Sequence, residues 1–348
     1  KFRMAIGSRS SSQQESVFAE VDFKSLLEAM PIWLCSLESL HKALPLQNEL
    51  FDLLIIDEAT QCDVASCIPA LYRSKRALVV GDPKQLRHVS FLSRDEQNKL
   101  LTKCGVDSFE FSYRDHSMID IAEQCVNTKD AIVVLDEHYR SSPRIIDFSN
   151  KRFYQSALRV MTERPNSWLM DSVEIVNVAD GVRAKSINEV EAEALVSKLR
   201  VVVDEQKIVT DNLKLSIGVV SFFRAQADYI QDLIFDSFSL DEIVAHKIRA
   251  GTPYAFQGEE RDIILISCCV DSESSAAVYT YMNREDVFNV AVTRAREKEI
   301  IFLSAPESAL PLGSLLRDFI QSINSKAGVY NPDLENRHHV VLEFIQTL

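Results

Sequence analysis

Two adjacent carboxylates, Asp57 and Glu58, directly follow the aliphatic run LLII at residues 53–56. In a phosphate-hydrolysing site of the Walker-B kind, the first acid would hold Mg²⁺ and the second would orient a water molecule. The alternative interpretation is a strand that ends at a polar turn, which is common in proteins. This stretch alone does not distinguish the two, so the rest of the chain must decide.

Polar groups also follow other aliphatic runs. In GDPKQL (81–86), Gly81 allows a tight turn, and the amide of Gln85 could contact a phosphate or a water molecule. Arg140 stands in a turn before a helix-like segment, and the pair Arg294 and Arg296 is expected on a helix just before a strand. Each has an ordinary explanation, such as a solvated arginine or an acid and an arginine that neutralise one another. Their recurrence at strand ends favours a shared site.

The elements that must position these groups are short apolar runs separated by helical stretches. Most runs are continuously apolar, which is typical of a parallel sheet covered on both faces. Helices are expected at residues 187–205 and 224–238, so the alternation predicts βαβ units and an α/β fold. The carboxyl ends of such strands carry ligand sites. The predicted strands are residues 31–36, 51–57, 77–82, 131–135, 173–178, 217–222, 262–270 and 299–305.

Composition narrows the class of protein. The 348 residues are 46% hydrophobic and 26% charged, which suggests two globular domains, and no apolar run is long enough to cross a membrane. A net charge of −13 argues against coating duplex nucleic acid, although a narrow groove with few donors is compatible with it. The seven cysteines show no metal-binding spacing, which predicts a reducing compartment, the cytoplasm or the nucleus.

Five segments in one order carry a resemblance to a known family. They resemble motifs II to VI of superfamily-1 helicases and are most similar to the Upf-like group, whose members translocate 5′ to 3′ on single strands. The resemblance covers roughly residues 30 to 310 and implies tandem RecA-like P-loop NTPase lobes with parallel sheets. The segments are DEATQ (57–61), GDPKQL (81–86), HYRSSPRIIDFSNKRFY (138–154), TPYAFQGEERDIILIS (252–267) and NVAVTRARE (289–297).

The resemblance implies ATP and Mg²⁺ as cofactors and gives roles to the matching residues. Asp57 would hold Mg²⁺ through water, and Glu58 would polarise the attacking water. Gln85 would sense the γ-phosphate, while Arg140 and Arg294 would neutralise the transferring phosphoryl group as arginine fingers. This division suits phosphoryl transfer, which needs positioning and positive charge more than covalent help.

Further residues are implied at the nucleotide and along a bound strand of single-stranded DNA or RNA. Hydroxyl and backbone contacts to phosphate would hold the strand without reading its sequence. The residues implied near the nucleotide are Gln257, Gly258 and Glu260. The residues implied along the strand are Ser36, Ser221, Arg224 and Thr252.

One expected motif, the phosphate-binding loop GxxxxGK[ST], does not occur in these residues. One interpretation is that an upstream part of the same protein carries it, so that residues 1–130 are the C-terminal part of an incomplete first lobe. Residues 131–322 would then form the second lobe and residues 323–348 a tail, in which VVLEFIQTL could pack as a helix. The alternative is a pseudo-helicase, a non-catalytic scaffold that binds nucleic acid or protein.

Overall fold

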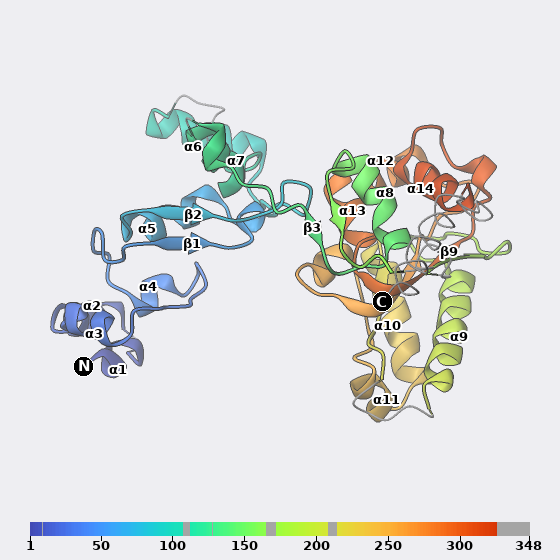
Figure 1. Cartoon of the computed structure of the whole chain (residues 1–348), viewed down its shortest axis with the longest axis horizontal. Helices are drawn as coiled ribbons and strands as arrows, with labels where there is room; N and C mark the ends of the chain where they lie inside the picture. Colours follow the sequence, from blue (N-terminus) through green and yellow to red (C-terminus); the bar gives the residue numbers. More distant parts are fainter. Residues whose placement is uncertain (9, 107–111, 127, 165–171, 208–213, 326–348) are drawn as a thin grey trace, which may run out of the picture. The chain divides into compact units, whose positions relative to one another are not determined.

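The computed structural model describes residues 1–8, 10–106, 112–126, 128–164, 172–207 and 214–325 (Figure 1). These residues form two compact units. Unit 1 consists of Lys1–Pro83 and Arg87–Val133, and unit 2 consists of Lys84–Leu86 and the chain from Val134 onward. A segment of three residues therefore leaves one unit, packs in the other and returns.

Unit 1 contains a small parallel sheet and short helices. Strands β1 (Leu54–Ile56) and β2 (Ala77–Val79) pair in parallel and are joined by α5 (Val64–Tyr72), which makes a βαβ unit. The Asp63 side chain caps α5 by accepting a hydrogen bond of 2.9 Å from the backbone N–H of Ser66. The other helices are α1 (Phe2–Ile6), α2 (Ser11–Ala19), α3 (Phe23–Ala29), α4 (Leu40–Ala43), α6 (Arg94–Cys104) and α7 (Met118–Cys125), with 3₁₀ turns η1 (Ala59–Gln61) and η3 (Lys129–Ala131).

The sheet of unit 1 is covered on one face only. Ile56 packs in a buried cluster with Cys67 of α5 and Met118 of α7. On the other face, the paired residues Ile55 and Leu78 are 58% and 50% exposed. Parallel sheets in α/β proteins usually have both faces covered, so unit 1 exposes apolar surface that such sheets normally bury.

Unit 2 is built on a five-stranded sheet that is parallel throughout, in the order β5-β9-β8-β6-β7. Its strands are β5 (Val173–Asn177), β6 (Ile217–Ser221), β7 (Arg249–Gly251), β8 (Arg261–Ser267) and β9 (Ala295–Leu303). A separate parallel pair is formed by β3 (Glu137–His138) and β4 (Arg159–Val160). The helices are α8 (Pro143–Phe153), α9 (Glu189–Glu205), α10 (Arg224–Ser237), α11 (Leu240–Ala245), α12 (Ala276–Met282), α13 (Glu285–Ala291) and α14 (Leu315–Asn324), with 3₁₀ turns η5 (Pro253–Phe256) and η6 (Glu307–Ala309).

Helices cover both faces of this sheet, with α9 and α10 on one side and α8, α12, α13 and α14 on the other (Figure 1). Successive residues of β8 show why. Ile263 and Leu265 belong to the cluster with α9 and α10, while Ile264 and Ile266 belong to the cluster on the opposite face. Because strand side chains alternate between faces, a continuously apolar strand fits only between two apolar layers.

The α/β fold with parallel sheets is confirmed, and six of the eight predicted strand segments contain strands. The predictions at residues 31–36 and 131–135 were wrong, because neither segment pairs with a strand in the part of the chain that the structure describes. Their apolar side chains are exposed, with Leu34 at 96% and Leu135 at 84%. The expected helices 187–205 and 224–238 are present as α9 and α10. α14 continues to Asn324, and VVLEFIQTL lies outside the described residues.

Candidate functional site

In unit 1, the carboxylates Asp57 and Glu58 stand on the loop that ends β1. Glu58 has a left-handed backbone conformation, with φ of 52°, and its N–H donates to Asp57 Oδ1 at 2.9 Å. The Gln61 side chain donates to Glu58 Oε2 at 3.1 Å. Asp57 is exposed and Glu58 half-buried, so both acids are held in place while their oxygens can still meet a ligand.

The loop after β2 lies beside this carboxylate loop. The buried Thr60 donates its hydroxyl to the Asp82 carbonyl at 2.9 Å, and the N–H of Ala59 donates to the Val80 carbonyl at 2.8 Å. Gly81 makes the close approach feasible, because a Cβ there would lie 3.0 Å from Thr60 Oγ1 and 3.1 Å from its N. The two predicted motifs of unit 1 therefore form one surface.

In unit 2, the predicted site residues Gln85, Gln257 and Arg294 come together. Arg294 Nη2 donates to Gln85 Oε1 at 3.5 Å, and Gln257 Nε2 donates to the Leu86 carbonyl at 3.3 Å. Gln85 comes from the segment Lys84–Leu86, which belongs to unit 2 although the chain on both sides of it belongs to unit 1. Residues 171 or more positions apart in sequence thus meet at one place.

Arg294, which the sequence predicted on a helix just before a strand, is 1% exposed. The predicted helix was wrong here, because α13 ends at Ala291, and Arg296 already lies in β9. The reason is the pairing of β8 with β9, which begins where Arg261 faces Ala295. Burying a guanidinium is costly unless it is hydrogen-bonded. Its Nε donates to the Val290 carbonyl at 3.1 Å, and Nη1 donates to the Glu259 carbonyl at 3.5 Å.

Glu260 pairs with two arginines, Arg140 and Arg296. Arg140 Nε forms an ion pair with Glu260 Oε2, and Arg296 Nε donates to Glu260 Oε1 at 2.9 Å. Partial burial alone would raise the pKa of Glu260, but the hydrogen bond from Arg296 and the charges of both arginines outweigh it and lower that pKa. Arg140 is therefore held by a carboxylate that a phosphate could replace.

The adjacent Glu259 was given no role from the sequence, yet it has two arginine partners. Arg249 Nη1 lies 3.0 Å from Glu259 Oε1, and Arg261 Nη2 lies 2.8 Å from Glu259 Oε2. Gly258, which precedes it, is exposed and has φ of 70°, a conformation that favours glycine. The QGEE segment is thus a turn clamped by ion pairs.

The residues predicted along a nucleic-acid strand differ in accessibility. Ser36, in unit 1, is exposed and bonds the Ser39 hydroxyl at 2.8 Å. In unit 2, the Arg224 side chain is 88% exposed at the start of α10, and Thr252 is half-buried at the start of η5. Ser221 is fully buried at the end of β6, so its hydroxyl is not presented to a ligand in this structure.

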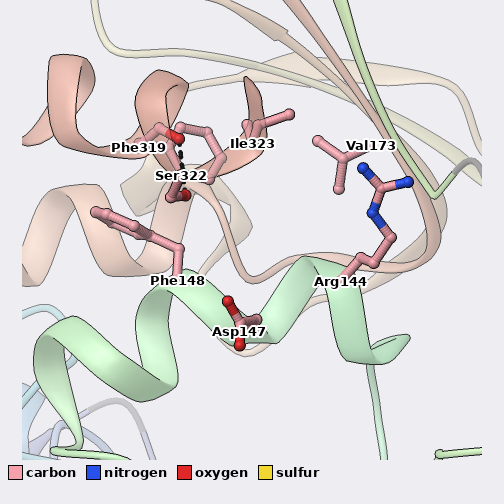
Figure 2. A pocket seen from close by; sticks show the side chains of 7 residues that line it. All are labelled: Arg144, Asp147, Phe148, Val173, Phe319, Ser322 and Ile323. Carbon is pink, nitrogen blue, oxygen red and sulfur yellow. Dashed lines mark hydrogen bonds between the residues drawn. The ribbon is translucent and has the colours of Figure 1, made fainter. Parts of the chain in front are cut away.

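A small pocket of unit 2 lies elsewhere, between α8 and α14 (Figure 2). Arg144 and Asp147 of α8 and Ser322 of α14 supply its polar groups, and Phe148 and Phe319 supply apolar walls. None of the predicted site residues lines it. It is a feature separate from the strand-end cluster.

The residues of unit 1 fit the magnesium that the motifs imply. Mg²⁺ prefers oxygen ligands and keeps several waters, so a single exposed carboxylate such as Asp57 is suited to holding it through its water shell. Across the part of the chain that the structure describes, no group of three or more histidine, cysteine, aspartate or glutamate side chains could hold a metal directly. None of the described helices is both long and apolar enough to cross a membrane.

Sequence reasoning missed Asn289, which is 1% exposed in α13. Its Nδ2 donates to the Lys84 carbonyl and to the Tyr154 hydroxyl, each at 2.9 Å. The residue stands in the motif NVAVTRARE, so a polar side chain among apolar ones was visible. Its partner, more than two hundred positions away, was not.

Comparisons with known proteins identify a family and several relatives. Residues 115–305, more than half of the chain, match the model of a family described as an AAA domain, and residues 3–91 match a second model with the same description. The uncharacterized ATP-dependent helicase MG140 of Mycoplasma genitalium is 30% identical over 292 residues, covering 80% of this chain and 25% of that protein.

Helicase SEN1 of Saccharomyces cerevisiae is 27% identical over 305 residues, which cover 83% of this chain and 13% of that protein. The chain thus spans a quarter or less of the length of these two relatives. Among solved structures, the PRRSV helicase is 14% identical with a TM-score of 0.32, and the match covers 72% of this chain and 34% of that one.

Proposed function

This chain belongs to the AAA-domain family of Upf1-like superfamily-1 helicases, and on that basis we propose that it forms part of an ATP-driven nucleic-acid motor. The motor hydrolyses ATP between two RecA-like lobes and moves 5′ to 3′ on single-stranded DNA or RNA. The observation that carries this proposal is the contact of Gln85 with the buried Arg294, since two residues expected to act at the γ-phosphate meet there within unit 2.

In the proposed reaction, the unit 1 loop acts on the γ-phosphate end of the nucleotide. Asp57 would hold Mg²⁺ through its water shell, and the bound ion would supply positive charge to the phosphate oxygens. Glu58 accepts a hydrogen bond from the attacking water and orients it. The bond from Gln61 to Glu58 and the left-handed backbone of Glu58 support this assignment, because both fix the carboxylate before a ligand arrives.

Unit 2 supplies the positive charge. Arg294 is held by backbone carbonyls and Gln85, so its orientation is set in advance. Arg140 pairs with Glu260, and we expect a phosphate to compete with that carboxylate for the guanidinium. Arginine fingers in such enzymes contribute about 10³–10⁵ in rate. Gln257, Gly258 and Glu260 line the nucleotide in this proposal.

The strand would contact exposed polar groups on both units. Arg224 and Thr252 stand after strands of the unit 2 sheet, and Ser36 stands on the unit 1 segment at 31–36. Contacts of this kind are made to phosphates and contribute binding affinity without sequence preference. Ser221 can contribute only if its surroundings open, because it is buried.

The phosphate-binding loop is proposed to come from outside the 348 residues. No GxxxxGK[ST] occurs in them, and the matched relatives are several times longer. That loop supplies much of the grip on the triphosphate. We therefore expect the 348-residue chain alone to turn over ATP poorly or not at all.

The experiment is an ATPase assay of the full-length gene product with single-stranded DNA, single-stranded RNA and neither. Stimulated turnover is expected with at least one nucleic acid. Glu58→Gln and Arg294→Ala should abolish it, since each removes a group required at the phosphate. The matched control is Arg159→Ala, an exposed arginine paired with Asp136. Robust stimulated turnover in the Arg294→Ala protein would contradict the finger assignment.

A second candidate is a non-catalytic scaffold that holds nucleic acid or a protein. The missing GxxxxGK[ST] favours it. It predicts strand binding that does not change with nucleotide, whereas the motor predicts affinity that differs between ATP-bound and nucleotide-free states. Fluorescence anisotropy with a labelled single strand, with and without a non-hydrolysable ATP analogue, separates the two.

A further inference from the structure

One face of α13 holds Lys84 at two points. Glu285 and Asn289 are four residues apart and therefore lie on the same side of the helix. Lys84 Nζ lies 3.6 Å from Glu285 Oε2, and Asn289 Nδ2 donates to the Lys84 carbonyl at 2.9 Å. The first contact is an exposed ion pair of small energetic weight. The second is a partly buried hydrogen bond from a buried side chain, so it helps to define the position of the backbone.

The next two residues of the segment are also held by unit 2. Gln85 accepts a hydrogen bond from Arg294, and the Leu86 carbonyl accepts one from Gln257. The Leu86 side chain is fully buried in the same core cluster as Phe256 and Phe288. Every residue of the segment Lys84–Leu86 therefore has an anchor in unit 2.

Asn289 is an unusual residue for its surroundings. It is 1% exposed, and its neighbours Phe288 and Val290 are fully buried. Its Oδ1 has no hydrogen-bond partner among the described residues, which costs free energy that an apolar side chain would not. The bonds from Nδ2 to the Lys84 carbonyl and the Tyr154 hydroxyl offset this cost. Holding Lys84 is thus the role that its chemistry supports.

We propose that Asn289 is a positioning residue that, with Gln257 and the core around the Leu86 side chain, forms a latch on residues 84–86. The latch sets the register between Gln85 and Arg294, and this role rests on the proposed function. Only Pro83 separates Lys84 from Asp82, whose carbonyl is bonded by Thr60 beside the carboxylate loop. Proline restricts the backbone at that link.

The latch is tested without ATP by limited trypsin digestion of the 348-residue chain. Trypsin cleaves after Lys84, and this bond is protected while the segment is docked. Losing the hydrogen bond to the Lys84 carbonyl in Asn289→Ala is expected to raise the cleavage rate after Lys84 about fivefold, since cleavage follows the open population. Asn150→Ala is the matched control, because Asn150 makes two backbone bonds with Leu158, away from the segment.

Equal cleavage rates after Lys84 in Asn289→Ala and Asn150→Ala would overturn the latch. If Asn289→Ala does not fold, Gln257→Ala replaces it, because that half-buried amide bonds the Leu86 carbonyl and its loss leaves the core intact. Faster cleavage after Lys84 is expected in Gln257→Ala as well, and an unchanged cleavage rate in that variant would also count against the proposal.

The positioning role is tested in the full-length protein by steady-state ATPase. Asn289→Ala is expected to lower kcat and the degree of nucleic-acid stimulation about fivefold or more while KM for ATP changes little, since no nucleotide contact is removed. Asn289→Asp should not restore the rate, because a carboxylate cannot donate to the Lys84 carbonyl. Faster cleavage with unchanged kcat and stimulation would overturn the positioning role.

Failure of the proposed function is distinguishable from failure of the latch. If the wild-type protein shows no ATPase, the motor proposal fails, and the trypsin result still decides whether the latch exists. If wild-type ATPase is robust and Asn289→Ala behaves as wild type in both assays, the latch alone fails.

Discussion

At the residue scale, two buried glutamates of unit 2 differ in their hydrogen bonding. Glu191 accepts hydrogen bonds of 2.7 Å from Ser267 Oγ, Ser304 Oγ and the N–H of Cys269, which join the ends of β8 and β9 to α9. Burial raises its pKa to about 7 despite these bonds. Glu299 in β9 is fully buried, and neither of its oxygens has a hydrogen-bond partner among the residues that the structure describes. Burial raises its pKa well above the ordinary value.

Glu299→Gln is expected to increase the free energy of unfolding at neutral pH and to flatten its pH dependence. Glu299 titrates at 4.5 when unfolded and higher when folded. Its stabilising contribution is therefore complete below that pH and is lost as the pH rises toward the folded pKa. Removing the Glu299 carboxyl group changes the slope of the unfolding free energy against pH by about 1 kcal/mol per pH unit. Urea unfolding between about pH 5 and pH 7 measures this slope.

The control for this substitution is Glu205→Gln, which changes an exposed glutamate at the end of α9. Its unfolding curves should run parallel to those of the wild type. Glu191 keeps its own pH dependence of the same sign in both variants. Curves for Glu299→Gln that also run parallel to wild type would show that Glu299 is not protonated in the folded protein.

At the element scale, the strands of unit 2 are placed by packing against helices and 3₁₀ turns on both faces. β6 passes so close to η5 that a Cβ on Gly218 would lie 2.7 Å from both Phe256 Cε1 and Ile264 Cδ1. Phe256 belongs to the turn that precedes Gln257. The position of Gln257 thus depends on the absence of a side chain at Gly218 in β6.

Gly218→Ala is expected to destabilise the chain by about 1–3 kcal/mol, because the added methyl must displace buried side chains. Thermal unfolding followed by circular dichroism measures it. Val201→Ala, a substitution at a half-exposed position of α9, should change the melting temperature little. A Gly218→Ala protein as stable as the wild type would mean that η5 can move away from β6 at low cost.

Strand prediction from the sequence succeeded for apolar runs that pair with other strands and are covered by helices. The runs at 217–222 and 262–270 became β6 and β8 because each is flanked by strands and covered by helices. The runs at 31–36 and 131–135 have similar composition but no pairing strand, and they stay irregular. Strand formation requires hydrogen bonds to another segment, which composition does not specify.

At the scale of the whole molecule, unit 2 includes a short segment whose place in the sequence would assign it to unit 1. Leu86 lies in sequence between β2 and α6 of unit 1, yet it packs in the core of unit 2. Unit 1 leaves Ile55 and Leu78 exposed on its sheet. Leu86 is buried because helices and strands of unit 2 pack around it, whereas Ile55 and Leu78 are exposed because no described helix covers their face of the sheet.

Leu86→Ala is expected to destabilise unit 2 by about 2–5 kcal/mol, the usual cost of truncating a fully buried leucine. Hydrogen exchange followed by mass spectrometry resolves the units, and faster exchange should appear in β8 and β9. Leu100→Ala, at an exposed position of α6, is the control. Unchanged exchange in β8 and β9 would mean that Leu86 does not belong to that core.

The 348-residue chain is expected to self-associate as its concentration rises, because an exposed apolar sheet face favours contact between molecules. Light scattering over a concentration series measures this. Ile55→Lys should reduce association, while Val201→Lys, on α9 of unit 2, should not. A monodisperse monomer at high concentration in the wild type would contradict the expectation.

The sequence by itself determined the α/β class, the parallel strands of unit 2 and the order of motifs, because apolar runs and charged strand ends are local patterns. It also singled out Asp57, Glu58, Gln85, Arg140 and Arg294 by their residue types and spacing. Only the tertiary structure decided that Arg294 is buried, that Arg140 pairs with Glu260 and that Asn289 holds Lys84. Those facts depend on contacts between distant residues, and such contacts exist only once the sheet has brought the strand ends together.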